Sequence, residues 1–263
     1  MSAEIPDTLL ARLGTAQRVV AFTGAGVSAE SGVPTFRGTD GIWKKFKPEE
    51  LASMAAFVRN PALVWEWYAH RKKIIAGIMP NPGHYALVKL EKMFPEFAVI
   101  TQNIDNLHRR AGSRTVHELH GNIERNYCMS CGHPCSNEEV LAGPAVPRCT
   151  KCGGIVRPDV VWFGEFLPDD AWDASVRAAA SADVFLSIGT SGVVHPAASL
   201  PVTAREQGAF LAEINPEPTP LTPLADAFLQ GPSGVILPRI CEELEHRSGT
   251  GEKDRAPLHG GSA

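Results

Sequence analysis

The chain has 263 residues, of which 25 are lysine or arginine and 29 are aspartate or glutamate, giving a net charge of −4. This mild negative charge argues against direct nucleic-acid binding, which needs a basic face. Hydrophobic residues make up 44% of the chain, enough for a packed core. No apolar run approaches the roughly 20 residues of a membrane span, and the first residues lack the pattern of a signal peptide. We therefore expect a cytoplasmic protein that binds neither membranes nor nucleic acids.

Short apolar runs alternate with amphipathic stretches along most of the chain. The amphipathic stretches predict helices, which in chain order fall at 4–16, 61–78, 83–93, 170–181 and 196–207. The apolar runs predict buried strands, which fall at 19–23, 97–101, 184–188, 209–214 and 234–237. Because none of these runs alternates strictly between polar and apolar residues, each suits a parallel sheet covered on both faces. The alternation of strand and helix predicts an α/β fold with a Rossmann-like, doubly wound parallel sheet.

A segment rich in cysteine, glycine and proline interrupts this alternation. The segment, residues 124–158, is expected to form a small zinc-ribbon insert, with a helical part of the same small domain at about 38–80. The flanking segments, 1–123 and 159–245, then form one large Rossmann-like domain, whose ligand the motifs below indicate. Residues 246–263 are polar and glycine-rich without periodicity, so we expect a disordered tail there.

Four of the six cysteines form two Cys-x-x-Cys pairs separated by seventeen residues, a spacing typical of structural zinc. The four are Cys128, Cys131, Cys149 and Cys152. Four thiolates can hold Zn²⁺ tetrahedrally, and a closed site of this kind is structural rather than catalytic. Two disulfides are the alternative, which a reducing compartment disfavours. Cys135 and His133 are rival ligands with a poorer spacing, and Cys241 reads as an inert buried thiol.

Polar or glycine-rich residues follow four of the predicted strands, at the edge where a doubly wound sheet binds its ligand. The first group, residues 24–29, reads G-x-G-x-x-A, a pattern that lets backbone N–H groups approach a pyrophosphate. The other groups are 102–106, 189–192 and 215–217. Each alone is compatible with turn or helix-capping chemistry. Together they predict a dinucleotide along the sheet edge, with the polar and aromatic segment 31–38 as a lid.

Two histidines three residues apart, His117 and His120, lack the H-E-x-x-H pattern of a zinc protease. A buried structural imidazole is the ordinary interpretation of a single histidine. His120 precedes a glycine, and a histidine side chain titrates near neutrality. His120 is therefore a candidate general base.

In this order, from about residue 16 to residue 240, the motifs resemble the sirtuins, a family of NAD-dependent protein-lysine deacylases. The resemblance is carried by the four cysteines and by segments 24–28, 31–37, 102–105, 120–122, 160–165, 189–191 and 215–217. It implies a Rossmann-like fold, one structural Zn²⁺ and NAD that is consumed as a co-substrate. The implied partners are acyl-lysine proteins or peptides, and the implied products are free lysine, nicotinamide and O-acyl-ADP-ribose.

The resemblance also implies roles for individual residues. His120, as general base on a ribose hydroxyl, and Asn103 would be catalytic. The implied cofactor-binding residues are Gly24, Ala25, Gly26, Ser28, Thr35, Phe36, Arg37, Gln102, Asn103, Ile104, Asp105, Gly189, Thr190, Ser191, Asn215, Pro216 and Glu217. The implied substrate-binding residues are Tyr68, Arg71, Val160, Trp162, Phe163, Gly164 and Val193. Segment 160–164 would pair with the substrate peptide as an added strand.

Tyr68 and Arg71 lie three residues apart and share one face of a predicted helix. They are similar to the Tyr-x-x-Arg pair of the desuccinylase- and demalonylase-like (class III) sirtuins. Arg71 would bind the acyl carboxylate in a bidentate manner, Tyr68 would donate a third hydrogen bond, and the small Ala52 would leave room. This predicts removal of succinyl, malonyl and glutaryl groups, and of acetyl groups more weakly. The alternative is a solvated basic face beside a core tyrosine.

Other functions share part of these features. A hydride-transferring NAD oxidoreductase shares the glycine-rich turn, but the sequence lacks a clear second strand that ends in an acid. A zinc-ribbon binding module would use only a small part of the chain. Among sirtuin-like activities, two alternatives to the removal of acidic acyl groups stay open. The enzyme is mainly a deacetylase, or it is a protein mono-ADP-ribosyltransferase.

Overall fold

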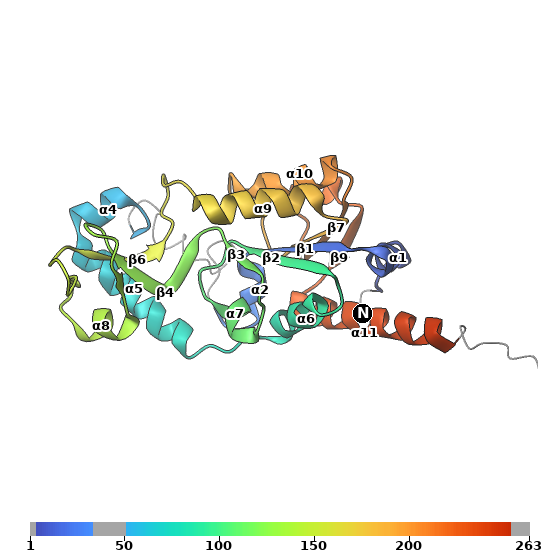
Figure 1. The fold of residues 1–263 in the computed structure, drawn as a ribbon, viewed down its shortest axis with the longest axis horizontal. Helices are drawn as coiled ribbons and strands as arrows, with labels where there is room; N and C mark the ends of the chain where they lie inside the picture. The colour runs from blue at the N-terminus through green and yellow to red at the C-terminus, as the bar shows by residue number, and fades with distance from the viewer. Residues whose placement is uncertain (1–3, 34–50, 254–263) are drawn as a thin grey trace, which may run out of the picture.

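Two lobes, each built around its own β-sheet, make up the protein (Figure 1). The computed structural model describes residues 4–33 and 51–253. The large lobe contains α1 (Asp7–Thr15), β1 (Arg18–Thr23), α2 (Ala25–Ala29), α6 (Pro82–Glu91), β2 (Glu96–Thr101), α7 (Leu107–Ala111), β3 (Val116–Glu118), α9 (Asp169–Ser181), β7 (Val184–Ile188), η2 (Ala197–Ser199), α10 (Leu200–Glu206), β8 (Phe210–Asn215), η3 (Thr222–Leu224), β9 (Ala227–Gln230) and α11 (Ser233–Lys253). The small lobe contains α4 (Met54–Arg59), α5 (Pro61–Ala76), β4 (Gly121–Cys128), β5 (Pro134–Cys135), α8 (Asn137–Ala142) and β6 (Val156–Val160).

The large sheet has the strand order β3-β2-β1-β7-β8-β9, and every neighbouring pair is parallel. Numbered along the chain within this sheet, the order is 3-2-1-4-5-6, the doubly wound Rossmann arrangement. The order reverses between β1 and β7. In the register of the sheet, Thr23 at the end of β1 lies beside Thr101 of β2 and Ile188 of β7. The predicted fold class is confirmed, and three strands end together at the point where such sheets bind ligands.

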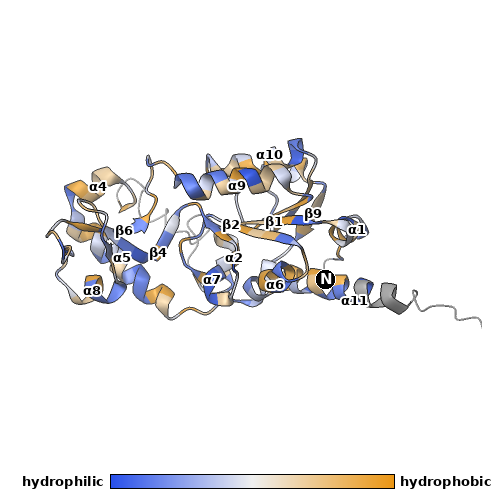
Figure 2. Cartoon of the chain, viewed as in Figure 1, coloured by the Kyte–Doolittle hydropathy of each residue, from blue (hydrophilic) through white to orange (hydrophobic). Residues whose placement is uncertain are grey.

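Alternate residues of the central strands pack on opposite faces of the large sheet. In β1, Val19 and Ala21 join a core formed with α1, α6 and α11. Val20 and Phe22 join a second core with α9 and α10. Figure 2 shows the hydrophobic colouring along β1 and β2, with hydrophilic residues on the outer side of α9. Burial on both faces explains why these strands read as continuous apolar runs.

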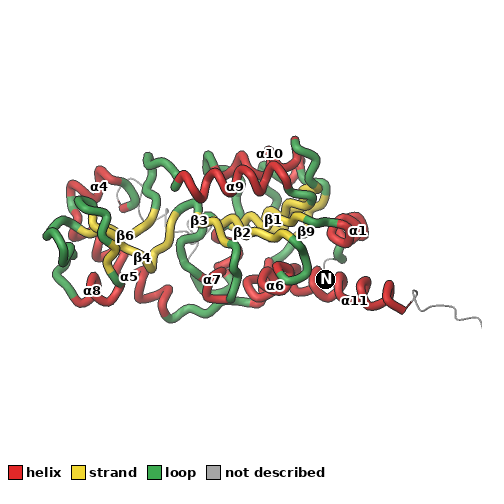
Figure 3. The backbone as a smooth tube through the Cα atoms, in the orientation of Figure 1, coloured by secondary structure: helices red, strands yellow, loops and turns green. Residues whose placement is uncertain are grey.

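The small lobe packs α4 and α5 against an antiparallel sheet of order β5-β4-β6 (Figure 3). One buried cluster joins Phe57 of α4 and Tyr68 of α5 to Trp162, just after β6, and to Cys128 and Cys149. The helix α5 begins where the Asn60 side chain accepts a hydrogen bond from the backbone N–H of Leu63, 3.1 Å away. The helices and the cysteine-bearing segment therefore share one core, although more than forty residues separate them in sequence.

The strand expected at 234–237 is wrong, because these residues form the beginning of α11. Ile236, Leu237 and Ile240 are buried while Val235 is exposed, which is helical periodicity. The carboxylate of Glu30 accepts hydrogen bonds from the Gly234 backbone N–H (2.8 Å) and the Ser233 hydroxyl (3.1 Å), and so caps this helix. The sixth strand of the sheet is instead β9, whose four residues gave too short an apolar run to find.

The helix α11 also continues to Lys253, whereas we expected irregular chain from residue 246. Ion pairs tie this end of the helix to its neighbours: Lys89 of α6 contacts Glu245 at 2.8 Å, and Arg247 pairs with Asp7 of α1. These contacts lie beyond Leu244, which is buried, on the polar end of the helix. Within the described ranges, neither α11 nor any other helix is long and apolar enough to cross a membrane.

Candidate active site

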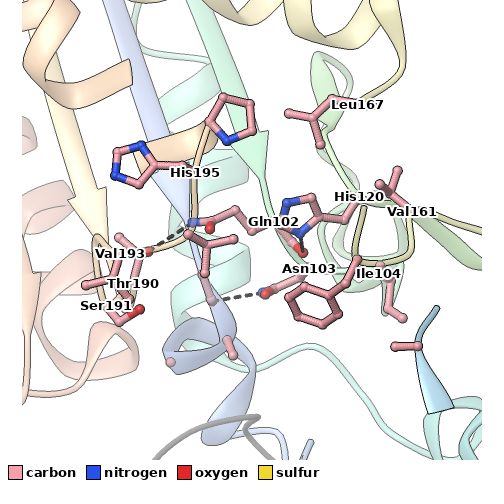
Figure 4. A pocket seen from close by; sticks show the side chains of 18 of the residues that line it. Gln102, Asn103, Ile104, His120, Val161, Leu167, Thr190, Ser191, Val193 and His195 are labelled. Atoms are coloured by element: carbon pink, nitrogen blue, oxygen red, sulfur yellow. Dashed lines mark hydrogen bonds between the residues drawn. The ribbon is translucent and has the colours of Figure 1, made fainter. Parts of the chain in front are cut away.

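A cavity of about 670 Å³ lies between the two lobes, at the carboxyl ends of β1, β2 and β7 (Figure 4). This volume is within the usual range for small-molecule sites. In Figure 4, His120, Ile104 and Val161 lie on one side, and Thr190, Ser191 and Val193 lie on the other. The small lobe contributes Ala52, Trp67 and Tyr68 to the wall.

The glycine-rich turn after β1 packs directly against the turn after β7. The backbone N–H of Gly24 donates to Ile188 O at 3.0 Å, and that of Gly26 donates to Gly189 O at 2.8 Å. A Cβ atom at Gly26 would lie 2.7 Å from Gly189 Cα, and Gly189 itself has a φ of +58°. Contact between the two turns therefore requires glycine here, in addition to any requirement from a ligand. Gly24, Ala25, Gly26 and Gly189 all line the cavity.

Two amide side chains after β2 connect the strand ends. The Asn103 side-chain NH₂ donates to Gly24 O at 2.9 Å and to the Ser28 hydroxyl at 3.2 Å. The Gln102 side-chain NH₂ donates to the Thr190 hydroxyl at 2.9 Å. Both side chains line the cavity beside Ile104 (Figure 4). The amides thus hold the turns after β1, β2 and β7 in fixed relative positions.

His120 lies on the cavity wall with one ring nitrogen held by the backbone. Its Nδ1 is 3.0 Å from the carbonyl oxygen of Gln102, which can only accept a hydrogen bond. Nδ1 therefore carries the proton in the neutral ring, and Nε2 presents a lone pair. Burial lowers the pKa of His120, and the bond to Gln102 raises it to a smaller extent. The arrangement favours a neutral imidazole that can accept a proton through Nε2.

The lowered pKa of His120 predicts how activity depends on pH. A histidine with an ordinary pKa, near 6.5, would lose its base function as the pH falls through that value. Because burial favours the neutral ring, His120 stays neutral to a lower pH. For a reaction that uses this ring as its base, we expect the acid limb of kcat/KM below pH 6.5, as rates measured between pH 4.5 and 9 would show. An acid limb centred above pH 6.5 would contradict it.

The opposite side of the cavity is formed by the turns after β7 and β8. Thr190, Ser191, Asn215 and Glu217 line it. The Asn215 side-chain NH₂ donates to Thr190 O at 2.9 Å, which joins the two turns. Pro216, which was also expected here, is not among the described lining residues, and its carbonyl oxygen accepts a hydrogen bond from the Gln230 side chain at 3.1 Å. The structure therefore brings predicted residues from four strand ends to one cavity.

Ser28 and Asp105 lie beneath the cavity rather than on its wall, as far as the described residues form it. The Asp105 carboxylate accepts from the Leu107 backbone N–H at 2.9 Å. Burial raises the pKa of Asp105, while this bond, a bond from Ser28 and the positive charge of Arg71 lower it. Ser28 also holds the Asn103 amide. Both residues support the side chains that face the cavity.

Tyr68 of α5 lies at the small-lobe end of the cavity, and both Tyr68 and Arg71 of the same helix are buried. Arg71 is not among the described residues that line the wall and lies behind it, close enough to Tyr68 to interact electrostatically. Tyr68 lines the wall, and its hydroxyl oxygen accepts a hydrogen bond from Trp162 Nε1 at 2.8 Å. The Arg71 guanidinium stacks over the ring of Trp67 at 5.0 Å from its centroid, and Trp67 also lines the wall. Burial lowers the pKa of Arg71, and attraction to Tyr68 and Asp105 opposes this. A buried cation thus lies next to a cavity-lining hydroxyl.

The segment after β6 crosses the mouth of the cavity. Val160, Trp162, Phe163 and Gly164 line it, with Val193 opposite. Phe163 and Val193 are exposed, whereas Trp162 is buried in the small-lobe core. The Phe163 backbone N–H donates to Ala52 O at 2.9 Å, so this segment is anchored to the chain two residues before α4. The cavity wall thus carries two exposed apolar side chains, one from the segment after β6 and one from the segment after β7.

The four expected zinc ligands come together in the small lobe, with all four sulfur atoms within 4.8 Å of one another. Individual Sγ–Sγ distances are 3.4 Å for Cys128–Cys152 and Cys131–Cys152, and 3.9 Å for Cys131–Cys149. Tetrahedral zinc with bonds of about 2.3 Å would place its sulfur ligands about 3.8 Å apart. The cluster therefore fits one Zn²⁺. Cys135 lies outside this set of four, with its Sγ 3.6 Å from His133 O.

Comparison with known proteins identifies the family. The model of the Sir2 family matches residues 24–196. An NAD-dependent protein deacylase of Pyrobaculum aerophilum is 55% identical over 238 residues, covering 89% of this chain and 94% of the relative. An NAD-dependent protein deacylase of Aquifex aeolicus is 51% identical over 232 residues, covering 88% and 97%. The chain belongs to the Sir2 family. The predicted resemblance to sirtuins is thereby confirmed.

Solved Sir2 structures share the whole architecture. A Sir2 homologue mutant in complex with ADP ribose has a TM-score of 0.90 and 44% identity, over 93% of this chain and 98% of that one. A Sir2 homologue in complex with NAD has a TM-score of 0.87 and 45% identity, over 94% and 96%. A Sir2 complex with a p53 peptide and NAD⁺ has a TM-score of 0.82 and 33% identity, over 91% and 98%. Members of the Sir2 family thus bind NAD.

Some residues that line the cavity were not predicted from the sequence, and some predicted site residues are not described by the structure. Thr35, Phe36 and Arg37, expected to bind the cofactor, fall outside the described residues. The cavity wall also includes Trp67, Leu167 and His195, which we did not propose as site residues. His195 lies seven positions after the end of β7, and this place after a strand end is the sequence feature that could have predicted it. Trp67 and Leu167 carried no signal, since either reads as an ordinary apolar residue.

Proposed function

We propose that this member of a family of NAD-dependent protein deacylases removes succinyl, malonyl and glutaryl groups from lysine, and acetyl groups more weakly. The reaction consumes acyl-lysine, NAD and one water, and the products are lysine, nicotinamide and O-acyl-ADP-ribose. The observation that carries the acyl preference is the pair formed by Tyr68 and Arg71. Arg71 is a buried cation beside a cavity-lining hydroxyl, and a carboxylate is the ligand that a guanidinium binds best. The small Ala52 on the same wall leaves room for an acyl chain.

The cofactor site in this proposal is the large-lobe half of the cavity. NAD, when bound, supplies the ribose carbon that the acyl-lysine oxygen attacks while nicotinamide leaves. The pyrophosphate would lie along residues 24–28, and Asn103 would hold the nicotinamide end through its side-chain oxygen, since its NH₂ group is bonded to Gly24 O. Asn215 and Glu217 would meet the ribose hydroxyls of the adenosine half, since both line the far side.

His120 is the catalytic base in this proposal. Its Nε2 lone pair would accept the proton of a ribose hydroxyl, so that this oxygen could take the acyl group while the acyl–nitrogen bond to lysine breaks and the lysine amine leaves. The bond from Nδ1 to the Gln102 carbonyl, at 3.0 Å, fixes the tautomer that this step needs. The four clustered cysteines, none of which is among the described lining residues of the cavity, would hold a zinc ion that takes no part in this chemistry, which agrees with a closed, structural site.

Acyl-lysine peptides are the proposed substrates, bound as an added strand between residues 160–164 and Val193. The exposed side chains of Phe163 and Val193, which both line the cavity, support this arrangement. Strand addition relies mainly on backbone hydrogen bonds. We therefore expect modest selectivity for the sequence around the acyl-lysine and stronger selectivity for the acyl group itself.

The change Arg71→Met tests the acyl preference. We expect kcat/KM for a succinyl-lysine peptide to fall roughly 10- to 100-fold more than that for the matched acetyl-lysine peptide, because only the former loses a charge-assisted hydrogen bond. Lys73→Met removes an exposed cation from the same helix and serves as the matched control. Mass spectrometry of both peptides with and without NAD provides the measurement. An equal fall for the two peptides would show that Tyr68 and Arg71 do not bind the acyl carboxylate.

A further inference from the structure

A single hydrogen bond joins the cavity-lining tyrosine to the segment at the cavity mouth. Trp162 Nε1 donates to the Tyr68 hydroxyl oxygen at 2.8 Å, and both side chains are almost completely buried, with exposed fractions of 1% and 2%. Their ring centroids are 6.4 Å apart. Because the bond lies in the core of the small lobe, water competes little for either partner, which makes the bond stronger and more selective than one at the surface.

The indole of Trp162 is itself held on both sides. The Arg157 guanidinium lies over the ring at 3.6 Å from its centroid, and Phe57 packs at 5.0 Å. Arg157 is fixed by a two-pronged ion pair to Glu165, with distances of 2.6 and 2.9 Å. Glu165 also accepts from the Trp162 backbone N–H at 2.8 Å. Because the ring and the backbone of Trp162 are both held, its indole N–H is directed at the Tyr68 hydroxyl.

The chemistry of the two groups determines whether the Tyr68 hydroxyl donates or accepts the hydrogen bond between them. An indole nitrogen only donates, whereas a tyrosine hydroxyl both donates and accepts. The bond from Trp162 therefore occupies a lone pair of the Tyr68 oxygen and leaves its O–H to donate elsewhere. Tyr68 lines the cavity beside Ala52, so an acceptor that enters this end of the cavity can receive that proton.

We propose that Trp162 is a positioning residue for acyl selectivity, whose indole N–H keeps the Tyr68 hydroxyl as a donor toward the carboxylate of an acidic acyl group. This inference rests on the proposed preference for acidic acyl groups. It assigns to the Trp162 side chain a role separate from the backbone of residues 160–164, which the proposed function uses for the peptide. An acetyl group has no carboxylate, so deacetylation does not use this donor.

The change Trp162→Phe tests the proposal, because phenylalanine keeps an aromatic ring and lacks the N–H. We expect the ratio of desuccinylation to deacetylation, each as kcat/KM on matched peptides, to fall about 3- to 10-fold, the worth of one neutral hydrogen bond. The ratio cancels any effect of the substitution that both reactions share. Trp65→Phe is the matched control, since Trp65 Nε1 donates to Val156 O at 2.9 Å in the same core, and the ratio should not change there.

The double variant Trp162→Phe/Tyr68→Phe separates positioning from general packing. If Trp162 acts through the Tyr68 hydroxyl, the double variant has the same ratio as Tyr68→Phe alone. Independent effects of the two changes, or an equal shift in the Trp65→Phe control, would overturn the inference while the proposed function stands. If Tyr68→Phe and Arg71→Met both leave the ratio unchanged, the proposed acyl preference fails, and this inference fails with it.

Discussion

His120→Ala is expected to lower kcat for deacylation by about 10²- to 10⁴-fold, the usual contribution of a general base. The neutral Nε2 of His120, with Nδ1 bonded to Gln102 O, is the cavity group best arranged to take a hydroxyl proton. The loss should appear in kcat rather than in NAD affinity, which isothermal titration of NAD measures. Exchange of labelled nicotinamide should continue, because that step precedes the proton transfer assigned to His120.

The other histidine of the motif provides the control. His117 lies in β3, three residues earlier, and the part of the cavity wall that the structure describes does not include it. His117→Ala should keep deacylation within a few-fold of the original chain. A His120→Ala enzyme with near-normal kcat, or one whose NAD affinity falls as far as its rate, would show that His120 has another role.

Removal of zinc is expected to unfold the small lobe and abolish deacylation. A structural zinc site contributes on the order of 10–16 kcal/mol, which matches or exceeds the total stability of a typical domain. Cys128 and Cys149 belong to the same buried cluster as Tyr68 and Trp162, so loss of the metal disturbs the acyl end of the cavity directly. Circular dichroism melts and peptide assays, before and after chelation, measure both effects. A metal-free enzyme that keeps its melting temperature would contradict this expectation.

Two cysteine variants identify the ligand set. Cys131→Ser removes one of the four clustered thiols and should reduce bound zinc below one equivalent per chain, as measured by atomic emission. Cys135→Ser changes a buried thiol of the same lobe that does not belong to the group of four. This variant should retain one equivalent of zinc per chain. The reverse result would assign Cys135 to the metal.

The strands of the large sheet were predictable where burial on both faces demands apolar residues. The expected runs match β1, β2, β7 and β8 to within one residue at each end. The short strand β3, with one half-buried histidine between two buried residues, gives no such run, and the apolar start of α11 resembles one. A run of four apolar residues does not distinguish a strand from one turn of a buried helix; only the neighbouring burial pattern does.

The candidate site was predictable where its residues follow strand ends, because the sheet topology itself brings these ends together. That reasoning found Gln102, Thr190 and Asn215, which the structure connects by hydrogen bonds. It did not separate residues on the wall from those beneath it, such as Asp105. The bond between Tyr68 and Trp162 spans 94 positions and depends on packing in the small lobe, so no local pattern could show it.

The hydrogen bonds that the Gln102 and Asn103 side-chain amides donate have a consequence for the thermodynamics of nucleotide binding. They join the turns after β1, β2 and β7 through protein groups alone. The conformational entropy of these three turns is therefore lost when the chain folds, and a nucleotide that binds later does not have to order them. The binding of a nucleotide should then cost little conformational entropy of the protein. Its binding enthalpy should come mainly from the contacts between nucleotide and protein.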